Sequence, residues 1–201
     1  MNILVDTAPQ AVEIDGTEYR LKTSFRDALL TMLAFEDRSL TMNEKAQIVL
    51  VNLYEEIPEN TPAALDKADW FLNGGAPERD EPVRERRLYS FSQDANYIYA
   101  AFRATHGIDL GTTDLHWWHF LSLFMDLGQD TTFCQMVAMR KRYYAGKCTR
   151  EERQAIAEMG SAFYIEDNEA YTLDELNQID ELNRYYQAAR QKRANRGQHP
   201  N

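Results

Sequence analysis

The strongest constraint on the fold is the density of large aromatic side chains in one short part of the chain, residues 88–127. Two segments there, divided by a turn at residues 105–108, are predicted to be helical. Their rings are Tyr89, Phe91, Tyr97, Tyr99, Phe102, Trp117, Trp118, Phe120 and Phe124. Such a density is typical either of a core that fixes one packing arrangement or of a surface that holds another chain.

Helical spacing favours a core position for most of these rings. The side chains predicted to face inward are Ile98, Tyr99 and Phe102 on the first helix and Trp117, Phe120, Leu121 and Phe124 on the second. Each ring would bury about 150–250 Å². Neighbouring residues on a helix diverge by about 100°, so Trp117 and Trp118 cannot point to the same side. We therefore expect one of the two indoles to be left for a second interface.

A β-hairpin is predicted over residues 11–22. Apolar and polar residues alternate over residues 12–14 and 17–21, and the pair Asp15-Gly16 separates the two runs. An Asp-Gly pair between alternating segments is the strongest short hairpin signal. An isolated hairpin is marginal in water, so it must pack either on the helices of its own chain or on a neighbouring subunit.

From residue 24 onward the pattern becomes helical. Candidate N-caps are Ser24, Thr41, Ser92, Thr113, Thr131 and Thr149, and Pro62, preceded by Thr61, suits the first helical position of a further helix. Helices are therefore predicted within residues 24–73, as aromatic helices within 89–145, and over 149–163. Short connections favour antiparallel neighbours. The predicted fold class is mainly α, a helical bundle with a short N-terminal β-hairpin, and the domain is expected to span residues 1–164.

Two charged stretches complete the predicted organisation. Residues 74–88 combine glycine, proline and charged side chains and are predicted to be a mobile loop, because they offer little apolar surface to bury. Residues 165–201 are predicted to be a charged C-terminal helix or tail, acidic first and basic afterwards, which suits a helix dipole. This tail is either a solvated helix or a docking arm. The apolar residues at helical spacing in it are Leu173, Leu176, Ile179 and Leu182.

Composition narrows the class of function. The 201 residues are 44% hydrophobic and carry a formal net charge of -10, which allows one sizeable core. That charge repels phosphate backbones and argues against a general nucleic-acid binder. The tract Arg140, Lys141 and Arg142, followed by two tyrosines, offers an alternative, because rings beside cations can stack on nucleic acid. Cations at the C-terminal end of a helix are the simpler interpretation.

The sequence also predicts a soluble intracellular protein with no membrane partner. Residues 1–6 lack the basic start and apolar core of a secretion signal, and no stretch approaches the roughly 18 apolar residues of a membrane span. Cys134 and Cys148 lack metal-ligand spacing, so reduced thiols are expected rather than a disulfide framework.

One cluster resembles a metal site. His116 and His119 are three residues apart on a predicted helix, with Asp109, Asp114 and His106 nearby in the sequence. Catalytic zinc normally needs three protein ligands, and the His-Glu-x-x-His spacing is absent, so histidines at the edge of an aromatic core are the favoured interpretation. Neither a serine nucleophile elbow nor a phosphate-binding glycine loop is present. We therefore expect no catalysis, no metal and no cofactor.

Several stretches of the chain resemble the bacteriophage Gp15 family, whose genes lie beside the tape-measure gene in the tail module of long-tailed phages. The matching stretches are residues 12–19, 23–26, 57–60, 70–71, 89–91, 94–102 and 115–118, and the match continues at Phe133 and Arg140. The part beyond Tyr164 lies outside the resemblance.

The resemblance implies a non-enzymatic tail assembly chaperone in the host cytoplasm. A tape-measure protein is a long helical chain whose apolar stripes favour aggregation until tail-tube subunits cover them. The implied partners are the tape-measure protein, the tail-tube protein and further copies of this chain; the alternative role is a structural tail or connector component of the virion. The candidate partner-binding residues are Tyr97, Tyr99, Phe102, His116, Trp117, Trp118 and Phe120.

Overall fold

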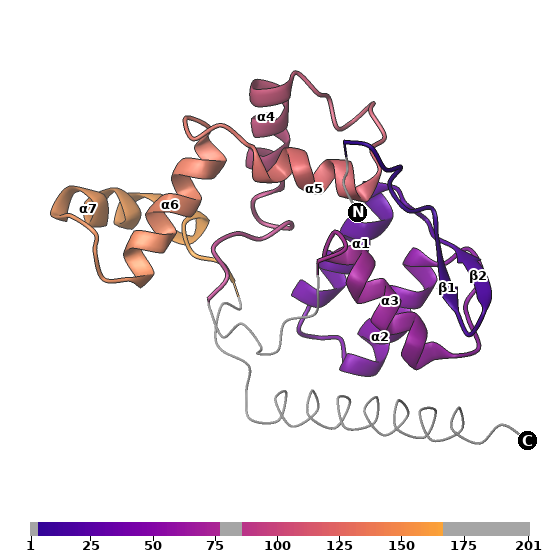
Figure 1. The fold of residues 1–201 in the computed structure, drawn as a ribbon. Coiled ribbons are helices and arrows are strands. Elements are labelled where there is room, and N and C mark those ends of the chain that lie inside the picture. The colour runs from indigo at the N-terminus through magenta and orange to yellow at the C-terminus, as the bar shows by residue number, and fades with distance from the viewer. Residues whose placement is uncertain (1–3, 77–85, 167–201) are drawn as a thin grey trace, which may run out of the picture.

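The computed structural model describes residues 4–76 and 86–166, which form a hairpin followed by α-helices (Figure 1). The elements in chain order are β1 (Ala11–Ile14), β2 (Thr17–Arg20), α1 (Phe25–Glu36), α2 (Met42–Leu53), α3 (Thr61–Leu72), α4 (Ala95–His106), α5 (Trp117–Met125), α6 (Thr132–Tyr144), α7 (Arg150–Met159) and a 3₁₀ turn (Gly160–Ala162). The predicted fold class, mainly α with a short N-terminal β-hairpin, is confirmed.

The hairpin has the predicted Asp-Gly turn and packs on the helices of its own chain. Asp15 and Gly16 both have positive φ, 53° and 78°, as a two-residue type I′ connection requires. Val12 faces Tyr19 across the antiparallel pair and is buried with Ile14 in the main hydrophobic cluster. Of the two partners that the sequence allowed for the hairpin, the structure therefore shows the helices of its own chain.

Most helices begin where the cap signals predict. Ser24, Thr41, Thr131 and Thr149 cap α1, α2, α6 and α7 with their side-chain oxygens, and α2 and α7 have complete capping boxes. In α3 the cap is Asn60 and the helix begins at Thr61, one residue before the predicted first position at Pro62. Local signals therefore place these five helix starts to within one residue.

Two predicted starts are wrong. Helix α4 begins at Ala95 rather than after Ser92, because Ser90 Oγ accepts the N–H groups of Ser92 and Gln93, both at 3.1 Å, and holds a turn there. Helix α5 begins at Trp117 rather than after Thr113, because the Thr113 N–H donates to Asp109 O at 2.9 Å in an earlier turn. The predicted aromatic helices thus start later than expected.

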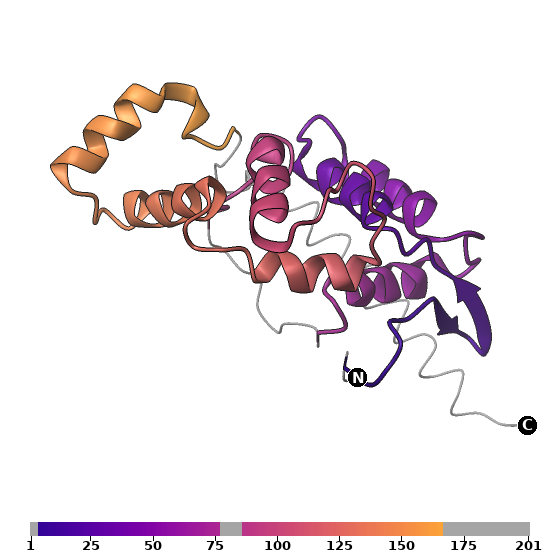
Figure 2. The same cartoon turned by 90° about the horizontal axis from the view of Figure 1, so that it is seen from above.

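The elements form an elongated arrangement, with the hairpin at one end and α6 and α7 at the other (Figures 1 and 2). The main hydrophobic cluster joins the hairpin to α1 through α5 and includes Phe133 of α6. A smaller cluster, formed by Met136, Cys148, Ile156 and Phe163, lies between α6, α7 and the segment after α7. No helix in the described part of the chain is long and apolar enough to cross a bilayer.

Parts of two predicted segments lie outside the described residues. These are residues 77–85 of the charged loop and 167–201 of the C-terminal tail. The division into a domain at 1–164 and a tail at 165–201 stays a prediction. The described chain continues past Tyr164 to a buried Ile165.

Candidate functional site

The aromatic segment builds a stacked core around Phe120 of α5. The Phe120 ring stacks on Phe102 of α4 with centroids 4.9 Å apart, on Phe25 of α1 at 5.0 Å and on Trp117 at 5.4 Å. Ring pairs of this kind add stability beyond the area they bury. The Phe120 side chain therefore holds α1, α4 and α5 together.

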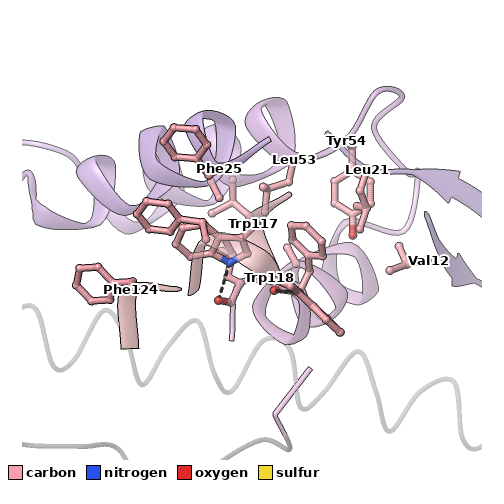
Figure 3. Close-up of a cluster of buried hydrophobic side chains, with 14 of the residues drawn as sticks. Val12, Leu21, Phe25, Leu53, Tyr54, Trp117, Trp118 and Phe124 are labelled. Carbon is pink, nitrogen blue, oxygen red and sulfur yellow. Dashed lines mark hydrogen bonds between the residues drawn. The ribbon is translucent and has the colours of Figure 1, made fainter. Parts of the chain in front are cut away.

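Both tryptophans are buried, so the expectation of one free indole is wrong. Trp117 is 1% exposed and Trp118 5% exposed. Their indole N–H groups donate to Leu72 O at 2.9 Å and Phe71 O at 2.8 Å, as the dashed lines in Figure 3 show. Carbonyls in the last turn of a helix have no partner within it. The C-terminal end of α3 can therefore accept both diverging indoles.

His116 caps α5 and ties it to the N-terminal segment. Its Nδ1 accepts the Trp118 N–H at 3.1 Å, and its Nε2 donates to Pro9 O at 3.0 Å, which assigns the neutral form with the proton on Nε2. Burial lowers the pKa of His116, nearby His119 lowers it further, and the bond to Pro9 opposes both. Because the Trp117 N–H donates to Thr23 O at 2.7 Å, this segment also pairs with the start of α1.

The three histidines of the described chain, His106, His116 and His119, do not gather at one place. The rings of His116 and His119 are 5.5 Å apart, but His106 contacts Leu123 O at 2.9 Å near the opposite end of α5. Within residues 4–76 and 86–166, no three His, Cys, Asp or Glu side chains gather closely enough to hold a metal ion.

Arg140 is not available for stacking on nucleic acid. Its guanidinium is 0% exposed and bonds both carboxylate oxygens of Asp94, at 2.6 Å and 3.0 Å. Further bonds reach the carbonyls of Leu88, Ala162 and Phe163. The sequence alone showed a cation late in a helix, whereas the folded chain uses it to join α6 to the start of α4.

An apolar pocket of about 320 Å³ opens between α1, α4, α5 and the connection before α5. Its lining is Leu29, Phe91, Ala95, Asn96, Ile98, Tyr99, Leu110 and Phe120. Tyr99 lies at the rim, 38% exposed, and its hydroxyl donates to Asp109 Oδ1 at 2.7 Å. The bonds from Tyr99 and from the Gly111 N–H lower the pKa of Asp109. The phenol is therefore held in place beside the opening.

Exposed leucines continue the apolar surface along α1. Leu33 follows Leu29 by four residues and Leu30 by three, so the three side chains share one side of the helix. Leu30 is 54% exposed and Leu33 37% exposed. The sequence analysis did not single them out. The sequence did contain a signal for these exposed leucines, because apolar residues lie almost all round α1. A helix that is buried on one side only needs a narrower apolar stripe.

Comparison with known proteins identifies the family. The model of the family described as Bacteriophage Gp15 protein matches residues 4–164. The chain belongs to the bacteriophage Gp15 family. The match includes the hairpin, every helix described above and the pocket. No curated protein and no solved structure matches the chain.

In this Gp15-family protein the predicted partner-binding residues separate into core and rim. Phe102, Phe120, Trp117 and Trp118 are buried, Tyr97 and His116 are half-buried, and Tyr99 is exposed. Tyr99 and Phe120 line the pocket, whereas His116 holds the start of α5. Four of the seven predicted residues thus belong to the core, and Tyr99 is the exposed one among the seven.

Proposed function

We propose that this protein is a non-enzymatic tail assembly chaperone that binds the tape-measure protein in the host cytoplasm during tail morphogenesis. One observation carries the proposal: an open apolar pocket lies beside exposed Leu30 and Leu33 on the same side of α1. Grooves of this kind take the apolar side chains of an amphipathic helix. A tape-measure chain, helical and striped with apolar residues, has the matching chemistry.

The charges around the pocket support apolar rather than ionic recognition. Arg26 pairs with Asp114 at 3.0 Å, and Arg103 pairs with Asp109 at 3.2 Å. These cations therefore already have carboxylate partners within the chain. The net charge of -10 would keep a complex soluble through repulsion between its bound copies.

The size of the site fits binding that must later be reversed. Burying one large aliphatic side chain contributes about 1.5–3 kcal/mol, and a pocket of about 320 Å³ holds few such groups. Each copy would bind weakly, and many copies would shield a long partner. Tube subunits with larger contacts could then displace them.

Co-expression with the adjacent tape-measure protein tests the proposal. The wild-type chain should raise the soluble fraction of the tape measure and co-purify with it, and the double variant Leu30→Asp/Leu33→Asp should do neither. Val51→Asp is the matched control, because Val51 of α2 is 53% exposed and Leu30 54%.

Three results would contradict this function. One is a tape measure that is equally soluble alone, with no complex surviving gentle purification. Another is equal loss of binding in the Val51→Asp control, which would show that the binding surface does not lie specifically on α1. The third is recovery of the chain in stoichiometric amounts from purified particles, which would favour a structural tail or connector component.

A further inference from the structure

The connection between α4 and α5 supplies one wall of the pocket (Figure 1). Within it, residues 107–114 form a strap that contains Leu110, a pocket-lining residue that packs against the main hydrophobic cluster. No residue of the strap is buried, whereas Ile98 of α4 and Phe120 of α5, which line other parts of the pocket, are buried. Polar bonds therefore have a large share in placing the strap.

Asp109 shapes the strap and ties it to α4. Its Oδ1 accepts the Gly111 N–H at 2.9 Å and the Tyr99 hydroxyl at 2.7 Å, and its Oδ2 lies 3.2 Å from Arg103 Nη1. These bonds close a turn within the strap and hold the side chain of Asp109 on α4. None of the three bonds reaches the backbone of Leu110 itself.

Arg26 of α1 holds the strap from the other side. Its Nη2 donates to Leu110 O at 2.6 Å and to Thr113 O at 3.2 Å, and its Nη1 donates to Asp114 Oδ1 at 3.0 Å. The planar fork of an arginine suits several acceptors at once. Leu29, which also lines the pocket, lies three residues after Arg26 on the same side of α1. Arg26 therefore sets how far the strap lies from this part of the pocket.

The guanidinium of Arg26 is anchored on the stacked core. Its central carbon lies 4.5 Å from the centroid of the Phe25 ring, which is buried and stacks on Phe120 at 5.0 Å. The side chains of Arg26 and Asp114 are nevertheless 44% and 67% exposed, and exposed ion pairs contribute little to stability. We therefore expect Arg26 to affect the shape of the pocket more than the stability of the fold.

We propose that Arg26 is a positioning residue that determines which apolar groups the pocket selects, by holding Leu110 and the strap toward α1. Without these bonds the wall moves outward, so a small group loses contact with Leu110 while a bulkier group gains room. The inference rests on the proposed function, because it specifies the size of the side chain that a partner helix inserts.

Two neutral aromatic probes test this role in the full-length chain, phenol with one ring and 2-naphthol with two. Amide NMR shifts of Asn96 and Leu110, which line the pocket, give the affinity for each probe. Arg26→Met keeps an unbranched stem over Phe25 but removes every donor. It should raise the affinity for 2-naphthol relative to phenol roughly tenfold, the usual effect of a small change in the size of an apolar pocket.

Arg142→Met is the matched control. The side chain of Arg142 is also 44% exposed and pairs with Glu152 at 2.7 Å, and its helix α6 does not line the pocket. This control loses the same charge and should keep the wild-type ratio of affinities. Arg26→Lys keeps the charge but lacks the planar fork, so its ratio should rise as in Arg26→Met.

Four results would overturn the proposal. They are an unchanged ratio in Arg26→Met, an equal rise in Arg142→Met, a wild-type ratio in Arg26→Lys, and no saturable shift at either amide in the wild type. Equal loss of both probes with a much lower urea midpoint in Arg26→Met would also overturn it, by showing that Arg26 supports the fold instead. Because no tape-measure protein is present, failure here leaves the chaperone proposal to its own co-expression test.

Discussion

Arg140 of α6 and Asp94 at the start of α4 form a bidentate ion pair in the interior, with Nη1 2.6 Å from Oδ2 and Nη2 3.0 Å from Oδ1. The carbonyls of Leu88, Ala162 and Phe163 accept the remaining guanidinium donors. All five N–H groups of the arginine are therefore used. The pair connects the segment before α4, helix α6 and the segment after α7.

Replacing Arg140 by Lys should destabilise the protein strongly. A lysine ammonium has three donors and no planar fork, so it cannot satisfy both Asp94 oxygens and the surrounding carbonyls. A buried acceptor left without its partner typically costs about 1–3 kcal/mol, and several are affected here, so the loss should be measurable as a lower midpoint of urea unfolding. Arg142→Ala on the same helix breaks only the partly exposed bond to Glu152 and should cost about 1 kcal/mol or less. Equal losses in the two variants would contradict this account.

Gly75→Ala should destabilise the chain more than Gly107→Ala. Both glycines have positive φ, 78° and 70°, where an alanine costs about 1–2 kcal/mol. A Cβ at residue 75 would also lie 2.6 Å from Trp118 Cη2, whereas none at residue 107 meets an atom within 4 Å. Overpacking of this kind adds about 1–3 kcal/mol. Calorimetry should therefore show the lower Tm for Gly75→Ala, and equal Tm values would exclude a tight contact with Trp118.

The features that the sequence predicted correctly depend on neighbouring residues. Thr41 and Glu44 form a capping box within one turn, as do Thr149 and Glu152, and Asp15-Gly16 sets the hairpin turn by its own backbone preferences. The alternation of residues 12–14 likewise identified the buried face of β1. Such signals are complete within a few residues, so fold class and most helix starts follow from them.

The features that were missed depend on residues far apart in the chain. His116 caps α5 while bonded to Pro9, and Arg140 is buried because it meets Asp94. Helical periodicity shows which side of a helix is apolar, but not which carboxylate or carbonyl will lie opposite. Helical periodicity could not identify the exposed leucines of α1 for the same reason, because their exposure depends on where the neighbouring helices lie.

His116 predicts a pH dependence of stability. Its pKa is lowered in the folded protein, so the unfolded chain binds more protons between the folded pKa and the ordinary value of about 6.5. The stabilising contribution is full above pH 6.5 and is lost as the pH falls toward the folded pKa. Protonation of Nδ1 would also remove the acceptor for the Trp118 N–H. Urea unfolding from pH 5 to 8 should show this slope.

The variant His116→Asn separates this effect from other titrations. Asparagine is a good N-cap and does not titrate, so the part of the slope due to residue 116 should disappear while α5 keeps a cap. Parallel profiles for the wild type and the variant would show that His116 does not carry the dependence.

Glu36 at the end of α1 should hold the turn before α4. Its carboxylate accepts the Ser90 hydroxyl at 2.7 Å, the Phe91 N–H at 2.9 Å and the Ser92 N–H at 3.2 Å. Glu36→Ala leaves the Ser90 hydroxyl and the Phe91 N–H without this acceptor, and leaves the Ser92 N–H with Ser90 Oγ alone. This should cost about 1–3 kcal/mol and speed hydrogen exchange at the amides of residues 91 and 92, more strongly at residue 91. Glu36→Gln keeps one oxygen and should give an intermediate effect. Because Phe91 also lines the pocket, unchanged exchange at both amides in Glu36→Ala would show that the pocket wall is held by packing alone.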